Sequence, residues 1–155
     1  MKRRTEPGER YEPLLTLLRT AETLWNLSRH FFEHWDLSPS QFNVLNALGL
    51  NPAGLSQVEL SRSLVMHRSN VTGLVDRLEK RNLVERQTHP EDRRFWRVVL
   101  TEEGKKLREE ILPDYYTLAE QIWGKIPIKN AHQLASDLQL LSRQAETVSK
   151  ERFAE

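Results

Sequence analysis

The chain has 155 residues, with 23 Lys+Arg against 22 Asp+Glu and no cysteine. A chain of this length predicts one domain that can fold without a disulfide or a metal ion. The lack of cysteine excludes disulfides, cysteine-ligated zinc and thiol chemistry. No apolar run approaches the ~20 residues that cross a bilayer, and no apolar stretch follows the basic N-terminus as in a signal peptide. We therefore expect a soluble, cytoplasmic protein with no membrane partner.

Positive charge is concentrated in the middle of the chain. Residues 62–108 contain twelve Lys or Arg and seven Asp or Glu, whereas the remainder has more acidic than basic residues. A basic segment in a nearly neutral protein is typical of a nucleic-acid partner. A solvated surface has the same composition, so charge alone leaves both interpretations open.

The first half of the chain predicts four helices. Apolar residues recur at steps of three and four from Leu14 to Trp35, which indicates a long amphipathic helix over about 12–36. Two capping-box patterns, beginning at Ser38 and Ser56, predict the starts of the next two helices. A fourth helix follows His67 and ends near Asn82, a residue that tolerates the left-handed conformation of a helix end.

The second half begins with a change of period. Residues 83–87 and 95–100 alternate between apolar and polar residues and predict a hairpin with a polar tip. Thr101 is placed to cap a further helix, which Pro113 should kink or interrupt. The last predicted helix has a heptad seam with no partner nearby in the sequence. This seam consists of Leu134, Leu138, Leu141, Ala145 and Val148.

This order of elements predicts a mainly α-helical protein with a small β-hairpin wing. Its centre is a winged helix-turn-helix, flanked by N- and C-terminal helices. The fourth helix has hydrogen-bonding residues in its first turns, where a recognition helix meets base edges in the major groove. The candidate DNA-binding residues of this helix are Arg68, Ser69, Asn70, Thr72, Gly73 and Arg77.

The region from Leu55 to Gly104 resembles the MarR (multiple-antibiotic-resistance-regulator) family of winged helix-turn-helix transcription factors. The resemblance rests on L-S-Q-V-E-L-S-R-S-L, R-S-N-V-T-G-L-V-D-R-L-E-K-R-N-L-V-E-R, H-P-E-D-R-R and V-V-L-T-E-E-G, and extends more weakly over Leu14–Val148. It implies a homodimer in which N- and C-terminal helices of both chains intertwine. On a palindromic site of double-stranded DNA, each recognition helix would enter a major groove and each wing the adjacent minor groove.

The resemblance also implies that different segments of the single domain, residues 1–155, serve dimerisation and DNA binding. Residues 12–36 and 105–152 would form the dimerisation helices, and residues 38–104 the DNA-binding lobe. In the wing, Asp92 would hold a neighbouring arginine and Arg94 would enter the narrow, electronegative minor groove. Arg93 and Arg97 would reach flanking phosphates.

The sequence departs from the family pattern in three ways. Gly73 stands where an arginine is frequent, so one common DNA contact should be missing. His67 takes the usual place of serine at the recognition-helix cap, where it should cap less well. Phe95 and Trp96 follow the wing tip where smaller residues are usual. We expect them to pack under the hairpin, and a role in stacking on DNA is the less favoured alternative.

In this family, small aromatic or anionic effectors often bind between the dimerisation helices and the DNA-binding lobe. The residues that would line such a pocket here are Trp25, Arg29, His30, Phe32 and Trp35. Core and dimer packing is the favoured explanation for the aromatic members of this set. Repression is the family's usual mode, although the sequence does not distinguish a repressor from an activator.

Two other functions remain as alternatives. His30 and His34 are four residues apart on one helix and could serve a metal-responsive regulator, although the favoured expectation is no metal. A helical protein-interaction module would use the wing to bind a protein in place of DNA. The chain contains no nucleophile-elbow or phosphate-loop motif, so we expect neither an enzyme nor a cofactor.

Overall fold

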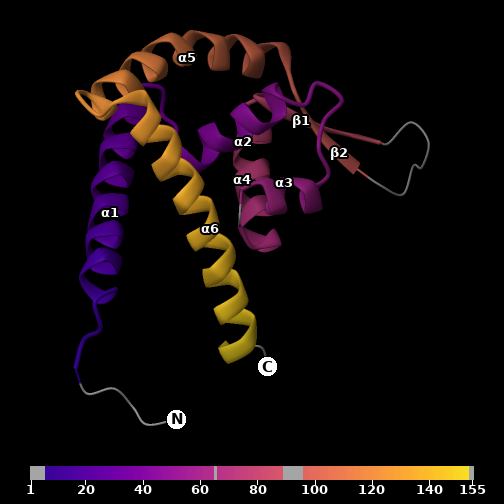
Figure 1. The fold of residues 1–155 in the computed structure, drawn as a ribbon. Helices are drawn as coiled ribbons and strands as arrows, with labels where there is room; N and C mark the ends of the chain where they lie inside the picture. Colours follow the sequence, from indigo (N-terminus) through magenta and orange to yellow (C-terminus); the bar gives the residue numbers. More distant parts are fainter. Residues whose placement is uncertain (1–5, 65, 89–95, 154–155) are drawn as a thin grey trace. The chain divides into compact units, whose positions relative to one another are not determined.

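The computed structural model describes residues 6–64, 66–88 and 96–153 (Figure 1). The elements in chain order are α1 (Tyr11–Glu33), α2 (Pro39–Gly49), α3 (Gln57–Ser63), α4 (Arg68–Lys80), β1 (Val84–Thr88), β2 (Trp96–Leu100), α5 (Glu102–Trp123) and α6 (Ile128–Phe153). This arrangement confirms the predicted fold class, a mainly helical chain with a two-stranded hairpin. The chain divides into two compact units, residues 1–110 and 111–155.

Local sequence signals determine where α2 and α3 begin. The Ser38 side chain accepts the Gln41 backbone N–H at 3.2 Å, and the Gln41 side chain accepts the Ser38 N–H at 2.8 Å. Ser56 and Glu59 form the same reciprocal pair at 3.2 and 2.8 Å. Both predicted capping boxes are therefore confirmed. Each one satisfies backbone donors that a helix start otherwise leaves unpaired.

The core of the first unit is formed where α2, α3 and α4 pack together with the hairpin. Phe42 and Leu45 of α2, Leu60 of α3 and Val71 of α4 are each 0% exposed. The other fully or nearly fully buried apolar residues include Phe32, Val44, Leu48, Val75, Leu78, Val84 and Val98. This core holds the helix-turn-helix and the base of the wing in one unit.

The wing is an antiparallel pair of strands in which Val84 lies opposite Leu100 and Thr88 opposite Trp96. The segment before α3 extends this small sheet, because Leu55 and Val98 exchange backbone hydrogen bonds of 3.0 and 2.8 Å. The start of α3 is thereby attached to the second strand of the wing.

The V-V-L-T-E-E-G segment joins the wing to α5. The Thr101 hydroxyl accepts the Gly104 N–H at 3.0 Å, which confirms Thr101 as the cap, and it donates to the Asn82 carbonyl at 2.6 Å. Asn82 has the predicted left-handed conformation, with φ +55°. A Cβ atom on Gly104 would lie 1.9 Å from the Leu83 carbonyl oxygen, so only glycine allows this close approach.

Pro113 does not interrupt α5, which continues from Glu102 to Trp123. The alternative that Pro113 breaks this helix is therefore wrong. Proline removes one backbone donor, which would otherwise bond the Glu109 carbonyl. Glu109 is exposed, so water can satisfy that carbonyl at moderate cost.

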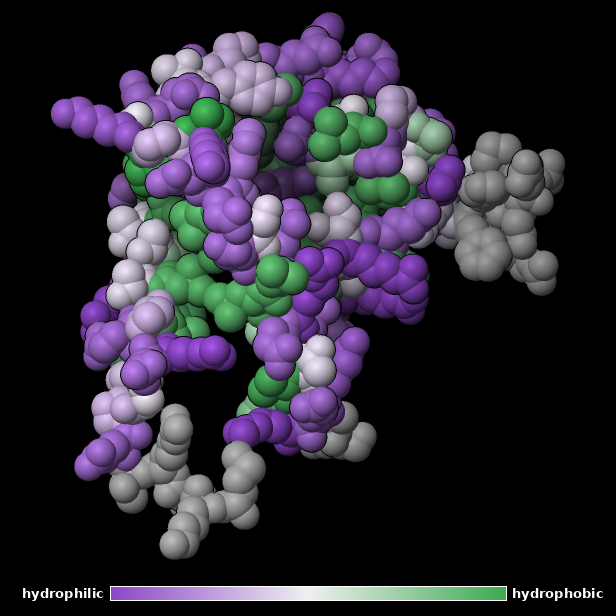
Figure 2. Space-filling model, in the orientation of Figure 1, coloured by the Kyte–Doolittle hydropathy of each residue, from purple (hydrophilic) through white to green (hydrophobic). Residues whose placement is uncertain are grey.

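Several helices carry apolar side chains that reach the surface (Figure 2). On α1 these include Leu14, Leu18 and Trp25, which are 46%, 57% and 43% exposed. On α6 they include Leu134, Leu138, Leu141 and Val148 of the predicted heptad seam. Among the described residues, no helix is long and apolar enough to cross a membrane.

Candidate nucleic-acid interface

The first turn of α4 presents a polar, exposed surface. Arg68, Ser69 and Asn70 are all exposed, and the Asn70 side chain makes no hydrogen bond to any residue that the structure describes. The Ser69 hydroxyl lies 2.8 Å from His67 Nδ1, and the Ser69 N–H donates to the same nitrogen at 3.4 Å. That long bond agrees with the weak cap predicted for His67.

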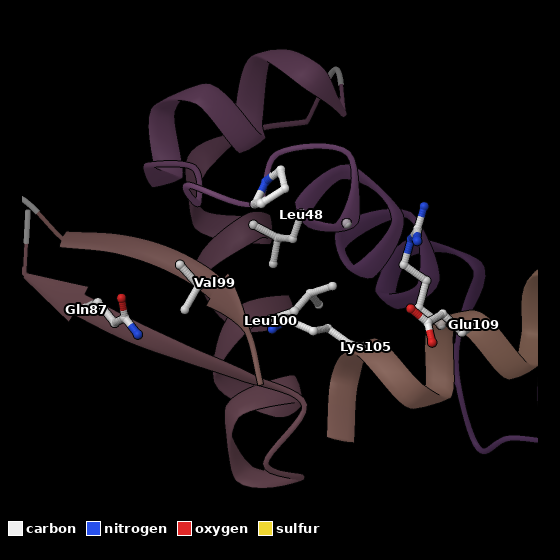
Figure 3. Close-up of a pocket in the computed structure, with 9 residues that line it drawn as sticks. Leu48, Gln87, Val99, Leu100, Lys105 and Glu109 are labelled. Carbon is white, nitrogen blue, oxygen red and sulfur yellow. The ribbon is translucent and has the colours of Figure 1, made fainter. Parts of the chain in front are cut away.

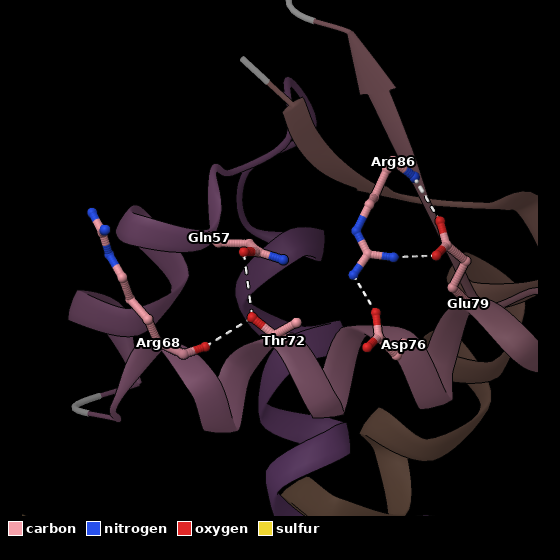
Figure 4. Close-up of polar contacts among 6 residues, drawn as sticks. All are labelled: Gln57, Arg68, Thr72, Asp76, Glu79 and Arg86. Carbon is pink, nitrogen blue, oxygen red and sulfur yellow. Dashed lines mark hydrogen bonds and ion pairs between the residues drawn. The ribbon is translucent and has the colours of Figure 1, made fainter. Parts of the chain in front are cut away.

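Thr72 is turned toward the protein (Figure 4). Its hydroxyl donates to the Arg68 carbonyl at 3.0 Å and contacts the Gln57 side-chain oxygen at 3.4 Å. The structure therefore adds Gln57, at the first position of α3, to the polar surface around the recognition helix. Its place directly after the Ser56 cap was the sequence signal that could have identified it.

Gly73 leaves open space on α4, and the exposed Arg77 side chain lies over it. A Cβ atom at residue 73 would be 3.7 Å from Arg77 Nη1, which is ordinary van der Waals contact. Arg77 thus brings a guanidinium close to residue 73, where an arginine is frequent in the family pattern.

Arg86 links the wing to the recognition helix (Figure 4). From strand β1 its guanidinium forms ion pairs with Asp76 and Glu79, both on α4. Its backbone N–H also donates to Glu79 Oε1 at 3.2 Å. In the sequence, Arg86 is only one basic residue among many, because its pairing depends on how the hairpin folds back onto α4. The three contacts satisfy carboxylate oxygens of both acids and attach β1 to α4.

The described part of the wing shows where its base residues lie. Arg97 Nη1 donates to the Ala53 carbonyl at 3.3 Å, and Nη2 lies 3.8 Å from Glu59 Oε2. Trp96 is 56% exposed, so the expectation that it packs under the hairpin is wrong; it occupies the outer end of β2. The predicted wing residues Asp92, Arg93 and Arg94, together with Phe95, lie outside the described residues.

The start of α3 stabilises one carboxylate near this surface. The pKa of Glu59 is lowered from its ordinary value, chiefly because it accepts the Ser56 backbone N–H and the Ser56 hydroxyl, with smaller effects from the charges of Arg97 and Arg62. The shift means that the capping box favours the ionised form of Glu59, whose carboxylate accepts the Ser56 N–H.

The predicted effector-pocket residues have different environments. Phe32 is 1% exposed and stacks on Phe42 at a centroid distance of 4.5 Å, so it belongs to the core. Trp35 is half-buried, and its indole donates to Glu110 Oε1 at 2.8 Å. By contrast, Trp25, Arg29 and His30 are exposed on α1.

A second set of contacts anchors the far end of α4. The Arg81 guanidinium donates to the Asp36 carbonyl and, at 3.1 Å, to the Trp35 carbonyl. Asp36 adopts φ +53° at this turn between α1 and α2. The recognition helix is thus held at its C-terminal end by the turn that carries Trp35.

The histidine pair of α1 lies in an exposed region. His30 Nδ1 is 3.8 Å from Glu33 Oε1, with both side chains largely exposed. Within residues 6–64, 66–88 and 96–153 there is no group of three or more His, Cys, Asp or Glu residues that could hold a metal ion.

Comparison with known proteins adds independent information. The MarR family model matches residues 35–94. The chain is 37% identical over 86 residues to the transcriptional repressor MprA of Escherichia coli K12. The matched residues are 55% of this chain and about half, 49%, of MprA. The chain is also 32% identical over 116 residues to the uncharacterized HTH-type transcriptional regulator YfiV of Bacillus subtilis, covering 75% of this chain and 72% of YfiV.

Solved structures agree with these relatives. The transcriptional repressor CouR bound to a 23-mer DNA duplex is 28% identical, with a TM-score of 0.74 over 90% of this chain and 99% of that chain. CouR from Rhodococcus jostii RHA1 bound to p-coumaroyl-CoA has a TM-score of 0.72 at 21% identity, over 97% and 98% of the two chains. With its helix-turn-helix, hairpin wing and these relatives, the chain belongs to the MarR family of winged helix-turn-helix transcriptional regulators.

Proposed function

We propose that this protein is a homodimeric, ligand-responsive repressor that binds a palindromic operator. The observation that carries the proposal is the exposed first turn of α4, where Arg68, Ser69 and Asn70 have no competing ion pair among the described residues. A recognition helix uses these early turns to reach base edges in the major groove. CouR, a relative of the same fold, is a repressor that has been solved on duplex DNA.

The proposed interface has two kinds of contact, those to base edges and those to phosphates or the minor groove. Asn70 reads base edges, because its amide can donate and accept at the same base. Arg68 and Arg77 contact phosphates or guanines from the same helix, while Arg93 and Arg94 of the wing neutralise the minor-groove side. Arg86 makes no DNA contact in this proposal, since its guanidinium is engaged by Asp76 and Glu79.

The dimer is supported by the exposed apolar faces of α1 and α6. Monomeric proteins rarely expose contiguous apolar stripes of this kind, and a heptad seam requires a partner helix. A two-fold dimer presents two recognition helices, so its operator should be an inverted repeat with half-sites about one helical turn, ~34–36 Å, apart.

The test is selection of duplexes from a random library, followed by fluorescence anisotropy on the selected and a scrambled duplex across a salt series. The selected sequences should form an inverted repeat. Asn70→Ala should cost about 1–3 kcal/mol on the selected duplex and much less on the scrambled one. Equal losses on both duplexes would show that α4 does not read sequence.

The wing requires a separate variant. Arg94→Ala should weaken binding to many duplexes and lower the salt dependence by roughly one counterion, because a minor-groove contact reads width more than sequence. An unchanged affinity and salt slope would remove the wing from the proposed interface.

A further inference from the structure

The two faces of the hairpin border different pockets, because successive residues of a strand point to opposite faces. A pocket of about 340 Å³ includes Gln87 and Val99 of one face and extends to Arg108 of α5 (Figure 3). It lies at the junction with residues 105–152, which the family resemblance assigns to dimerisation. A ligand there would be the effector already proposed. The other face, whose Arg86 pairs with α4, borders a separate pocket.

This separate pocket, which we call the wing recess, has a volume of about 330 Å³ and lies between the hairpin and the start of α3. Trp96 is its largest side chain and is 56% exposed at the outer end of β2. Val98, two residues along the same strand, is 1% exposed and connects the recess to the core. The residues that line the wing recess are Ser56, Gln57, Val58, Arg86, Trp96 and Val98.

The wing recess is continuous with the proposed DNA interface. Gln57 lines it, and the side-chain oxygen of Gln57 contacts the Thr72 hydroxyl of α4 at 3.4 Å (Figure 4). Trp96 directly follows residues 89–95, which include the arginines that the proposed function assigns to the minor groove. One sugar-phosphate backbone separates a major groove from the adjacent minor groove, and the first helix of a helix-turn-helix crosses that backbone. The recess, at the start of α3, should therefore face this backbone.

The charge of the wing recess indicates which part of the backbone it suits. Arg86 is the one cation among its six lining residues, and its guanidinium is paired with Asp76 and Glu79. The recess therefore has little free positive charge to offer a phosphate or any other anion. A duplex keeps the faces of its bases stacked inside, so its uncharged surface between the grooves is deoxyribose. An exposed indole beside an apolar recess suits that sugar.

We propose that Trp96 packs its indole against one deoxyribose in each half-site, between the nucleotides contacted by α4 and those contacted by the wing. This contact rests on the proposed function. The Gln57 side-chain nitrogen, which has no hydrogen-bond partner among the described residues, donates to the phosphate next to that sugar. Every nucleotide of DNA carries the same sugar, so the contact adds affinity without reading sequence.

Affinity measurements distinguish this contact from the others at the interface. Trp96→Ala should weaken binding to the selected and the scrambled duplex by the same factor, about tenfold, because buried apolar area is lost. The slope of log affinity against log salt should stay unchanged, since the sugar contact releases no counterion. Arg94→Ala, by contrast, should lower this slope, and Asn70→Ala should act mainly on the selected duplex. Gln87→Ala, on the opposite face of the hairpin, is the control and should bind as the unaltered protein does.

Fluorine NMR measures the contact directly. The four tryptophans are replaced by 5-fluorotryptophan, and the Trp96 signal is identified as the one missing from Trp96→Phe. On either duplex, this signal should lose its shift between H₂O and D₂O buffer, because the sugar excludes water from the indole. The other three signals should respond as in the free protein, since none of those residues lies in α3, α4 or the hairpin. Urea unfolding checks that Trp96→Ala is folded; the fluorine result on the unaltered sequence does not depend on that variant.

Two results would overturn the contact while leaving the proposed function in place. A Trp96 signal that keeps its solvent shift on bound duplex would show that DNA does not cover the indole, and would leave this face to a protein partner. A loss in Trp96→Ala that is confined to the selected duplex, or that lowers the salt slope, would contradict an uncharged sugar contact. If the unaltered protein binds no duplex at all, the proposed function fails and the contact fails with it.

Discussion

Arg77 and Arg86 are both basic residues of the DNA-binding lobe, and their surroundings give them different tasks. Arg77 is exposed and lies over Gly73 on the open face of α4. Arg86 has a side chain that is 24% exposed and ion-paired with two carboxylates of α4. Positive charge in the sequence therefore overstates the cations available to DNA, because Arg86 is used to position the wing.

Replacing each of these arginines with methionine should separate the two roles. Arg77→Met should leave the urea midpoint nearly unchanged and lower the slope of log affinity against log salt by about 0.9, the effect of one phosphate contact. Arg86→Met should reduce the free energy of unfolding by about 1–3 kcal/mol, since it leaves Asp76 and Glu79 without their partner. Neutralising those carboxylates as well, with Asp76→Asn and Glu79→Gln, should recover part of this loss. A normal urea midpoint for Arg86→Met would contradict the positioning role.

Two glycines provide a second matched pair, because both lie in helices but only one is in close contact with backbone. Gly73→Ala should stabilise the protein by about 0.5–1 kcal/mol, since alanine is the better helix former and its methyl group meets only the flexible Arg77. Gly104→Ala should destabilise it by about 1–3 kcal/mol or more, because its methyl group would collide with the Leu83 carbonyl. Urea unfolding of both variants measures the difference. Similar shifts in the two would mean that the Leu83 carbonyl moves aside.

At the scale of elements, local signals predicted more than long-range ones. The starts of α2 and α3 were predicted correctly because a capping box is contained within four residues. The alternative that Pro113 interrupts α5 is wrong. The low helix propensity of proline does not take into account that water can bond the Glu109 carbonyl, which loses its backbone donor. Contacts such as Arg86 with Asp76, or Arg81 with Asp36, join residues on different elements. No periodicity in the sequence indicates them.

The capping box of α3 should make part of the stability depend on pH. The pKa of Glu59 in the folded protein lies below its ordinary value of 4.5, so its contribution is present above pH 4.5 and is lost as the pH falls through the folded-state pKa. Glu59→Gln keeps a side-chain acceptor for the Ser56 N–H and should flatten the pH dependence of the urea midpoint in this acidic range. Ser56→Ala should cost about 1 kcal/mol at neutral pH. An unaltered acid profile in Glu59→Gln would show that other carboxylates control it.

At the scale of the whole molecule, the surface contains apolar residues that the chain itself leaves exposed. Sequence periodicity predicted this property for the heptad seam of α6, because it shows which residues share a helix face. It did not predict the pocket beside Arg108, which is built from α2, both strands and α5. A helix face is a property of one segment, whereas a pocket depends on how several segments pack.

The exposed seam of α6 should make the protein a dimer in solution. Sedimentation at micromolar concentration should give about twice the 18.2 kDa chain mass. Leu138→Asp should shift the protein toward monomer and lower its stability, because it places an unpaired charge in an apolar interface. Leu50→Asp is the matched control: Leu50 is 70% exposed at the end of α2, outside the proposed interface, and its replacement should leave the mass unchanged. A folded monomer before any substitution would refute both the dimer and the palindromic operator, because a single recognition helix offers no two-fold symmetry for an inverted repeat to match.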